Sequence, residues 1–423
     1  RHHCRSAEGA RLREPAVTAR TAAYDATARE RVVLGRNSVR GAITLGVIGF
    51  AFVLFGIVMN PRQAYMSYLV AYAAVVGTVL GALMLVMMSY LVSARWYVVL
   101  RRLTEAVAGT LPILALLSIP ILVGLRYLYP WAMPPQDVSR ALQTEIAKKE
   151  AYLNVPFFVI RTIAYFAIWI VIAWLLRHWS VRQDREGGVK LTLWSRRLSA
   201  AGVPFMAIAL TFASFDWLMS LTPAWWSTVY GVYYFAGAFV AGISLIALLA
   251  MLAARAGVLG GYVGDEHFGA LGMLLLTFVI FWAYIAFSQL LIIWIGDIPA
   301  EAVWYITRLH GGWGQVGLAL LIFHFAIPFL LLLSRDLKRS PRAMAAIAIM
   351  LLIMHYFDIY WLAMPVLHPD GMIIHWLDFA SLAAVIGCTA AYGLWLFQRT
   401  PPVPVGDPFL EESVRYGTER VHD

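Results

Sequence analysis

Six ionisable side chains interrupt long apolar stretches of the sequence and are its clearest candidates for chemistry. They are Arg161, Asp216, His324, His355, Asp358 and Asp378. Apolar surroundings make an idle charge costly, so groups of this kind face a bundle interior or a water-filled cavity and often mark the path of a substrate or a proton. Because imidazole and carboxyl groups accept and release protons, the pattern favours proton transfer.

Among the six groups, Asp216 is expected to have the highest free-energy cost of carrying a charge. It lies within the stretch 211–238, in an apolar run about one turn before the turn residues 221–223. The negative end of a helix dipole adds there to the penalty of burial. We therefore expect Asp216 to carry a proton at neutral pH or to face a cation, and either state makes it a candidate for proton handling. The alternative is a structural aspartate that braces the turn by hydrogen bonds.

His355 and Asp358 form a second candidate pair. A spacing of three residues places them on one helix face, where a carboxylate can orient and polarise an imidazole. The remaining groups have simple structural alternatives. Arg161 can extend outward or neutralise a carboxylate, His324 can be a hydrogen-bonded histidine of the bundle, and Asp378 can lie at an interface with water.

A second polar set lies at the other ends of the apolar runs and is a candidate route for proton uptake. It comprises Glu105, Asp265, Glu266 and His267. The alternative is that these residues cap helices, because acids at a helix N-terminus are favoured by the dipole.

The composition indicates which elements position these groups. Of the 423 residues 61% are apolar and 13% are charged, and the apolar runs are long and closely spaced, which predicts an all-α polytopic membrane protein. Two cysteines, without a CxxCH motif, exclude a disulfide framework, an iron–sulfur cluster and covalent c-type haem in this chain. The net charge of +9 comes from Arg and Lys at helix ends, a pattern typical of membrane orientation and not of nucleic-acid binding.

Ten apolar runs are each about twenty residues or more and are long enough to cross the hydrocarbon layer as helices. They cover 41–59, 66–92, 105–125, 155–176, 198–220, 225–252, 267–295, 316–334, 344–367 and 373–397. Residues 1–40 are then an Arg-rich arm, 41–399 the transmembrane domain and 400–423 a polar tail. Prolines inside the spans are expected to kink them. They are Pro112, Pro120, Pro204 and Pro328.

The basic residues orient the spans. Most lie before the first span, in the loops after the second, fourth, sixth and eighth spans, and after the tenth. Because cytoplasmic loops collect positive charge, we expect both termini in the cytoplasm. This topology places the six interior groups in the outer half of the bilayer, with His324 about two turns into its span.

The longest external loop, 127–154, holds Val138, Leu142 and Ile146 among charged neighbours. Their four-residue spacing predicts a short amphipathic helix, lying on the membrane surface or covered by a partner. The aromatic residues around Asp216 are most simply interpreted as an interfacial belt. They are Trp217, Trp225, Trp226, Tyr233 and Tyr234.

The stretch SFDWLMSLTPAWWSTVYGVYYFAGAF, together with AYLNVPFFVIRTIAYFAIW at 151–169, resembles the NrfD/polysulfide-reductase-type membrane subunits of bacterial alternative complex III. That complex is a quinol:cytochrome c (or other electron acceptor) oxidoreductase. The resemblance covers most of 41–400 and is closest to the F-type subunit, quinone-binding subunit 2. It implies two four-helix bundles, spans two to five and six to nine, flanked by the first and last helices.

The resemblance also implies a function and partners. It implies quinol oxidation near the outer face of the bacterial inner membrane, with quinone or menaquinone bound and electrons passing to other subunits. The implied partners are a paralogous NrfD-like membrane subunit, an iron–sulfur subunit, a multihaem cytochrome c subunit and small membrane-anchor subunits, besides lipids. Asp216 and Arg161 match the motifs as catalytic candidates, and Trp217 and Trp226 are the candidate quinone-contacting residues; His355 and Asp358 join them from depth and spacing.

Three alternatives remain open at this stage. The chain can be a non-catalytic membrane scaffold of the same complex. It can bind b-type haem through His324 and His355, which lie at similar depth on consecutive spans. A secondary transporter would show broken helices repeated in both halves, and no convincing pair of interruptions is present.

Overall fold

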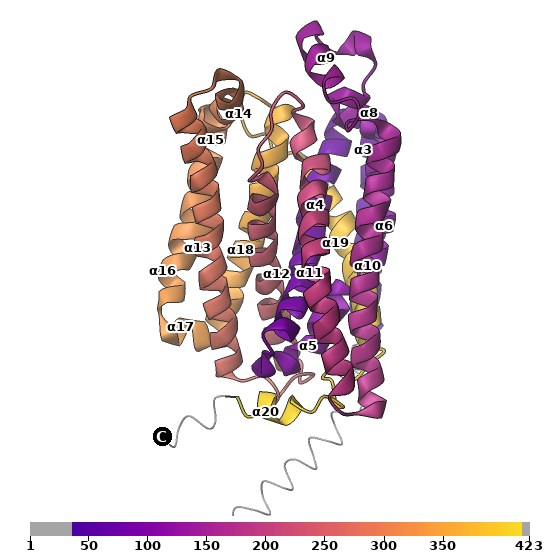
Figure 1. Ribbon diagram of the computed structural model, residues 1–423, viewed down its shortest axis with the longest axis vertical. Helices are drawn as coiled ribbons and strands as arrows, with labels where there is room; N and C mark the ends of the chain where they lie inside the picture. Colours follow the sequence, from indigo (N-terminus) through magenta and orange to yellow (C-terminus); the bar gives the residue numbers. More distant parts are fainter. Residues whose placement is uncertain (1–35, 417–423) are drawn as a thin grey trace, which may run out of the picture.

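The computed structural model describes residues 36–416, and within this range the chain is an all-α, multi-pass membrane protein (Figure 1). Ten helices of the described part are long and apolar enough to cross a membrane. The expected arm at 1–40 falls outside the described residues up to position 35, and so does the end of the tail after position 416.

The spans consist of the following helices, in chain order. The first two spans are α3 (Arg36–Met59) and α4 (Pro61–Leu91), and the third consists of η1 (Arg95–Tyr97), α5 (Val98–Ala108), α6 (Leu111–Leu117) and α7 (Ile119–Val123). The fourth to seventh spans are α10 (Val155–Glu186), α11 (Lys190–Trp217) with η4 (Met219–Leu221), α12 (Tyr230–Arg255) and α13 (Asp265–Gly296). The eighth consists of α15 (Gly311–Ala319), η5 (Leu320–Ala326) and α16 (Ile327–Leu333), the ninth of α18 (Pro341–Ala363) with η6 (Met364–Val366), and the tenth is α19 (Trp376–Phe397). Shorter helices connect them. They are α8 (Leu125–Leu128), η2 (Pro130–Ala132), η3 (Pro135–Asp137), α9 (Arg140–Ala147), α14 (Pro299–Leu309), α17 (Arg335–Arg339) and α20 (Leu410–Val414).

The number and order of the predicted spans are confirmed, but several predicted ends are wrong. The third span begins at Arg95 and not at 105, because the charged pair Arg101 and Arg102 hides its first turns from a hydropathy pattern. In the same way α10 continues to Glu186 and α11 begins at Lys190, since helices extend beyond their apolar parts. The sixth span begins at Tyr230, so Trp225 and Trp226 lie in a loop.

The prolines act differently from span to span. Near Pro112 and Pro120 the third span breaks into α5, α6 and α7, whereas Pro204 lies inside an unbroken α11. Before Pro328 the helix widens into η5, a π-helical segment. Proline has no N–H to bond the carbonyl four residues earlier, so the backbone adjusts just upstream of it.

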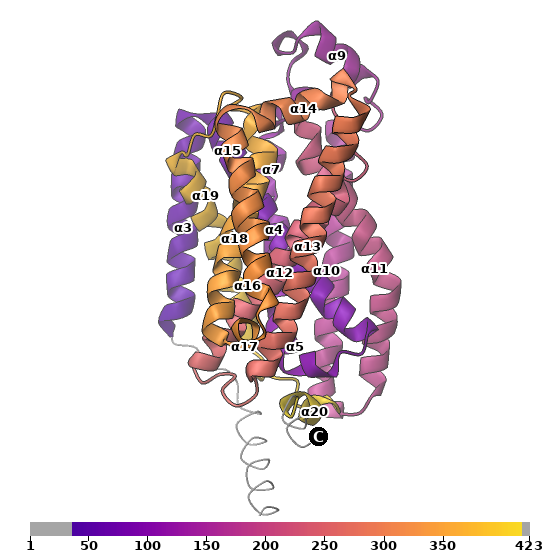
Figure 2. The ribbon, with the colours of Figure 1, turned by 90° about the vertical axis from the view of Figure 1, so that its left-hand side faces the viewer.

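The ten helices form two four-helix bundles with the first and last helices beside them (Figures 1 and 2). The first bundle holds α4, the third span, α10 and α11, and the second holds α12, α13, the eighth span and α18. The long helices α4 and α12 pack against each other where the bundles meet, and α3 packs on α19. This is the arrangement that the family resemblance implied.

Glycines allow α4 and α12 to approach closely. A Cβ atom added to Gly81 would lie 2.1 Å from the carbonyl oxygen of Ala238, and one added to Gly242 would lie 2.5 Å from the carbonyl carbon of Gly81. Backbones packed this closely are typical of membrane helices. Because the hydrophobic effect does not drive helices together inside lipid, small residues that permit close van der Waals contact are common where they meet. The contact therefore depends on these positions having no side chain.

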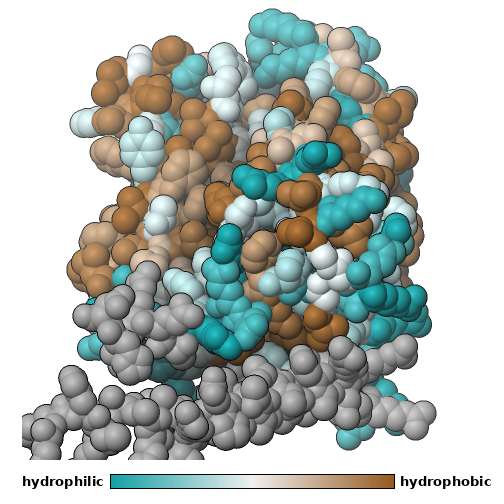
Figure 3. Space-filling model, turned by 60° about the horizontal axis from the view of Figure 1, so that its bottom comes forward, coloured by the Kyte–Doolittle hydropathy of each residue, from teal (hydrophilic) through white to brown (hydrophobic). Residues whose placement is uncertain are grey.

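The two ends of the molecule differ. The first residues of α3 and the short helix α20 lie at one end, called here the α20 end, while α9 and α14 lie at the other, the α9 end (Figures 1 and 2). Hydrophilic residues gather at the α20 end beside the apolar belt (Figure 3). The amphipathic helix predicted in the 127–154 loop is present as α9, but Val138 precedes it in extended backbone, because Ser139 caps the helix.

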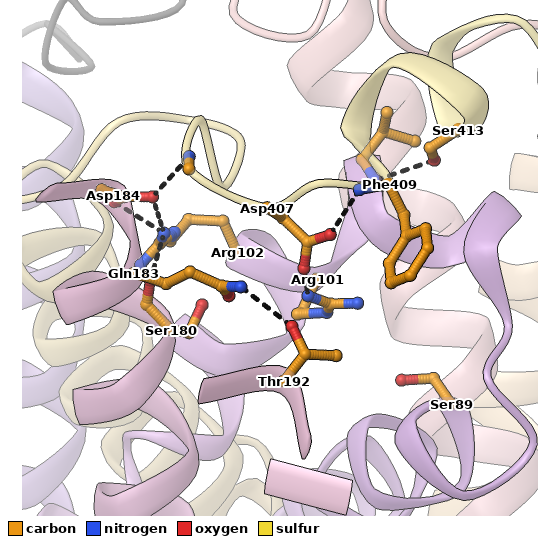
Figure 4. Close-up of polar contacts among 12 residues, drawn as sticks. Ser89, Arg101, Arg102, Ser180, Gln183, Asp184, Thr192, Asp407, Phe409 and Ser413 are labelled. Carbon is orange, nitrogen blue, oxygen red and sulfur yellow. Dashed lines mark hydrogen bonds and ion pairs between the residues drawn. The ribbon is translucent and has the colours of Figure 1, made fainter. Parts of the chain in front are cut away.

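The described part of the tail, residues 400–416, folds across the α20 end and contacts both bundles (Figure 4). Asp407 forms a buried ion pair with Arg101 of the first bundle. The Ser413 hydroxyl donates to the carbonyl of Trp96 in the third span at 2.7 Å, and its carbonyl oxygen lies 3.0 Å from Nε2 of His267 in α13. The tail thus links the third span to the second bundle.

The close approach of α4 and α12 predicts the effect of a larger side chain. Gly81→Val should lower the stability of the full chain by at least about 1–3 kcal/mol, because backbone atoms have to move apart. Thermal unfolding in detergent measures this. Gly260→Ala is the matched control, since its added Cβ meets nothing closer than 3.5 Å; equal melting temperatures for both variants would contradict the tight contact.

Candidate functional site

The second bundle buries a carboxylate without a cation among its hydrogen-bond partners. Asp358 of α18 accepts a short hydrogen bond from the Tyr233 hydroxyl of α12, and its other oxygen accepts from the Trp282 indole nitrogen of α13 at 3.1 Å. All three side chains are buried. Two neutral donors therefore fix the orientation of the carboxyl group, while its charge has no compensating partner among the described residues.

Two buried histidines adjoin this carboxyl group. A Cβ atom added to Gly237 of α12 would lie 3.2 Å from Asp358 and 3.3 Å from Nδ1 of His355, so both side chains face the same point on α12. The His324 ring stacks on the Trp282 indole, with centroids 4.1 Å apart. The ring nitrogens of His324 have no hydrogen-bond partner among the described residues, and the His355 ring has only the Ala74 backbone of α4 beside it, without full hydrogen-bond geometry. The cluster thus holds groups able to take up protons and little that restrains them.

His324 lies deeper than the sequence suggested. Its span begins at Gly311 and not at 316, which places His324 near the middle of the span instead of about two turns from its start. The span begins earlier because Gly311, with a φ of 57°, and Gly312 open the helix ahead of the apolar run. His324 lies within the π-helical segment η5, a distortion that is common at functional sites.

An apolar cavity of about 460 Å³ adjoins His355, between α4, α5, α12, α18 and α19. Leucine, valine and alanine side chains form most of its wall. Three lining residues have polar atoms without a hydrogen-bond partner among the described residues: the His355 ring, the Tyr356 hydroxyl and the Thr389 hydroxyl. Buried polar groups are normally paired. The cavity therefore suits a mainly apolar molecule that offers a few hydrogen-bonding atoms.

Asp216 belongs to a separate site in the first bundle and faces a cation. Arg161 of α10 binds it in a bidentate manner, with Nε to Oδ2 at 2.8 Å and Nη2 to Oδ1 at 2.9 Å. The Tyr165 hydroxyl donates to Oδ2 at 2.8 Å, and the Ser220 hydroxyl donates to the Asp216 carbonyl at 2.5 Å. Both carboxylate oxygens are thus occupied by donors from the protein, which is the geometry of a structural brace.

The interfacial-belt interpretation of the aromatic residues is wrong for four of the five. Trp217, Trp225, Tyr233 and Tyr234 are buried, and Trp217 packs among Tyr72, Phe166 and Trp169 in the first bundle. Only Trp226 is exposed, at 56%. A hydropathy pattern cannot distinguish a belt from a core here, because aromatic side chains serve in both.

Asp378 lies at the α9 end, outside the His355 cluster. It accepts from the backbone N–H of His375 at 2.8 Å, so it caps the start of α19, and from the Ser67 hydroxyl at 2.5 Å. Its contacts are those of a helix cap that also ties α19 to α4.

The polar residues at the α20 end do not form one group. Glu105 is buried in α5, about three turns inside the third span and not at its start, with Arg102 at 3.8 Å and the Ser180 side chain beside it. Arg102 also binds Asp184 at 2.8 Å (Figure 4). Asp265 is exposed, Glu266 pairs with Arg339, and His267 caps α13 through the Gly264 N–H at 3.1 Å.

The sequence reasoning missed four residues of the site: Tyr233 as a donor, Trp282, Tyr356 and Thr389. Asp358 itself indicated that hydrogen-bond donors lie nearby, because a buried carboxyl group needs donors and tyrosine and tryptophan side chains supply them. Nothing in the sequence indicated which aromatic residues would be these donors.

The Arg161–Asp216 pair predicts an asymmetric response to mutation. Arg161→Met should lower the stability of the chain by about 3–5 kcal/mol, because it leaves a buried carboxylate unpaired, whereas the double variant Arg161→Met/Asp216→Leu should recover much of the loss. Thermal unfolding in detergent checks both. Arg140→Met on the exposed face of α9 is the control, and an unchanged melting temperature for Arg161→Met would contradict a bracing role.

No protein-family model matches the sequence, and no curated protein matches it either.

Proposed function

We propose that the chain is a membrane subunit of a quinol:cytochrome c (or other electron acceptor) oxidoreductase of the alternative complex III type. In this proposal it binds quinol in the cavity beside His355, which extends toward the α20 end and not toward the outer face that the resemblance implied, and accepts protons from it. The observation that carries the proposal is the group of buried His355, Asp358 and His324 without charged partners, next to an apolar cavity with unpaired polar atoms. The motif at 214–239 supports the kind of complex.

The cavity has the chemistry that a quinol requires. A quinol has two hydroxyl groups on a flat ring and an apolar isoprenoid chain, and a cavity of about 460 Å³ accommodates a ring with the start of its chain. The ring nitrogen of His355 can accept a hydrogen bond from one hydroxyl, while Tyr356 and Thr389 offer further hydroxyl partners. Ile386 on α19, 44% exposed, lies at the rim, where the chain can continue into lipid.

Oxidation of a quinol releases two protons and two electrons. As the O–H bond breaks, His355 takes up the proton at its free ring nitrogen. The electrons leave to iron–sulfur or haem centres of the partner subunits, since the family resemblance implies such partners. Asp358 stabilises the cation formed on His355 from one turn away, and Tyr233 and Trp282 hold its carboxyl group in place. His324 offers the next proton acceptor.

The cellular setting belongs to the same proposal. The chain spans the bacterial inner membrane with the α20 end in the cytoplasm, because the basic residues concentrate at that end. The paralogous membrane subunit, the iron–sulfur subunit and the multihaem cytochrome c then associate with it in the complex.

A scaffold role has its own support in the first bundle. Each guanidinium nitrogen of Arg161 and each carboxylate oxygen of Asp216 has a hydrogen-bond partner within the chain, and the motif around the pair packs as aromatic core. We therefore assign the Asp216 region to structure and the His355 region to proton handling. The same chain can perform both tasks, because different bundles provide them.

His355→Gln separates catalysis from scaffolding. In the assembled complex this variant should lower quinol oxidation per complex by roughly 100-fold or more, because the proton acceptor is lost. The control is His310→Gln, since His310 is exposed at the α9 end and bonds the Ile306 carbonyl within its own helical turn. Normal turnover per assembled complex, with reduced assembly, would instead favour a scaffold. A Soret band from the isolated chain would support the haem alternative.

Filling the cavity tests where the quinol binds. Ala390→Phe introduces a ring into the wall of the cavity and should raise the KM for quinol about tenfold or more without preventing assembly. Ile349→Phe adds volume on the exposed face of α18, away from the cavity, and should leave the KM unchanged. Equal kinetics for the two variants would place quinol binding elsewhere.

A further inference from the structure

A second cavity, of about 470 Å³, lies at the α9 end beneath the loop that holds α9. Its wall comes from the loop before α10 and from the segment after α11, and most of it is apolar. The residues that matter here are Lys148, Lys149, Met219, Trp225 and Trp226. The cavity is separate from the one beside His355, because the two share no lining residue.

The polar groups of this cavity are hydrogen-bond donors. Lys148 pairs with Glu145 at 2.6 Å, but the ammonium group of Lys149 bonds only the carbonyl of Pro223, also at 2.6 Å, and no carboxylate within 4.0 Å among the described residues. Trp225 is buried, and its indole N–H has no partner there. Two ammonium groups and an indole N–H together favour an anionic oxygen ligand.

An apolar stripe on α11 leads from the membrane to this cavity. Phe205, Ile208 and Phe212 are 61%, 57% and 39% exposed, and Phe215 and Met219 continue their spacing into the cavity wall. Alternating steps of three and four residues keep the four residues of α11 on one helix face, and Met219 follows in η4. At about 1.5 Å per residue the stripe is roughly 20 Å long, somewhat more than half of the hydrocarbon layer. It matches the length and chemistry of an acyl chain.

We propose that this cavity binds the phosphate headgroup of an anionic phospholipid, with an acyl chain along the α11 stripe. The phosphate oxygens accept hydrogen bonds from Lys148, Lys149 and the Trp225 indole, and the exposed Trp226 lies at the headgroup level, where tryptophan is favoured. Neither the quinol site nor its protons take part, so the lipid site stands independently of the proposed function.

The state of Lys149 agrees with such a ligand. Burial lowers the pKa of its ammonium group below the ordinary value; the Glu145 carboxylate nearby partly opposes this effect, and Lys148 adds to it. A phosphate in the cavity would favour the charged form and offset the effects of burial and of Lys148.

Native mass spectrometry of the full chain in detergent tests the proposal. Phosphatidylglycerol and phosphatidylcholine with the same acyl chains are titrated in parallel, and the anionic lipid should bind more tightly. Lys148→Gln/Lys149→Gln should weaken phosphatidylglycerol binding about tenfold, corresponding to about 1.4 kcal/mol, and leave phosphatidylcholine binding little changed. Trp225→Phe, which keeps an aromatic side chain but removes the N–H donor, should weaken phosphatidylglycerol binding by a smaller factor.

Arg140→Gln is the matched control, because it removes a positive charge from the same loop without touching the cavity. It should bind phosphatidylglycerol as the parent chain does. The proposal is overturned if the double lysine variant binds phosphatidylglycerol equally well, or if Arg140→Gln loses as much affinity. It is also overturned if millimolar inorganic phosphate displaces the lipid, because the site would then recognise the free anion and not the lipid.

Discussion

The contact between α4 and α12 is the interaction on which the rest of the structure depends. Their backbones meet at Gly81 and Gly242, and the hydroxyl of Tyr234 crosses from α12 to the carbonyl of Ala73 at 2.7 Å. Each bundle closes around one of these two helices. The cavity beside His355 takes part of its wall from both, so the geometry of the candidate quinol site follows from how closely the bundles approach.

The two bundles treat a buried aspartate in opposite ways. In the first bundle Arg161 and Tyr165 neutralise and saturate Asp216, and a group held like this has little freedom to exchange protons. In the second bundle Asp358 has only neutral donors, and the adjacent histidines have no charged partner among the described residues. Because a low-dielectric interior makes uncompensated charge costly, the second arrangement is the one suited to transient protonation. Both aspartates are buried, so the structural site and the proposed proton-handling site differ mainly in whether a cation compensates the charge of the aspartate.

The sequence predicted the spans and the candidate groups better than it predicted their partners. The length of an apolar run depends only on consecutive residues, so the ten helices and their order could be predicted directly from the sequence. The spacing of His355 and Asp358 also placed both correctly on one helix face. The partners of Asp358 could not be predicted, because Tyr233 and Trp282 come from two other helices and their packing decides the contact. The cavity was equally hidden, since an apolar void is formed by residues that look like ordinary core.

Errors in depth had a related cause. Hydropathy marks where a helix is apolar and not where it begins, so Glu105 was assigned to the start of a span in which it lies about three turns deep. The extra turns carry Arg101 and Arg102, which bind Asp407 and Asp184. When the ion-pair partners of charged residues lie far away in the sequence, the neighbouring residues do not show that the charged ones belong to a buried part of a span.

The course of residues 400–416 has a consequence for how the protein is made. Ser413 joins Trp96 of the third span to His267 of α13, and it follows all ten spans in the chain, so it leaves the ribosome after them. During synthesis the two bundles therefore insert before the Ser413 contacts exist, and they can still adjust to each other at the α20 end. Once residues 400–416 have been made, their contacts hold the third span and α13 together at the α20 end, so these contacts need the segment that follows the last span.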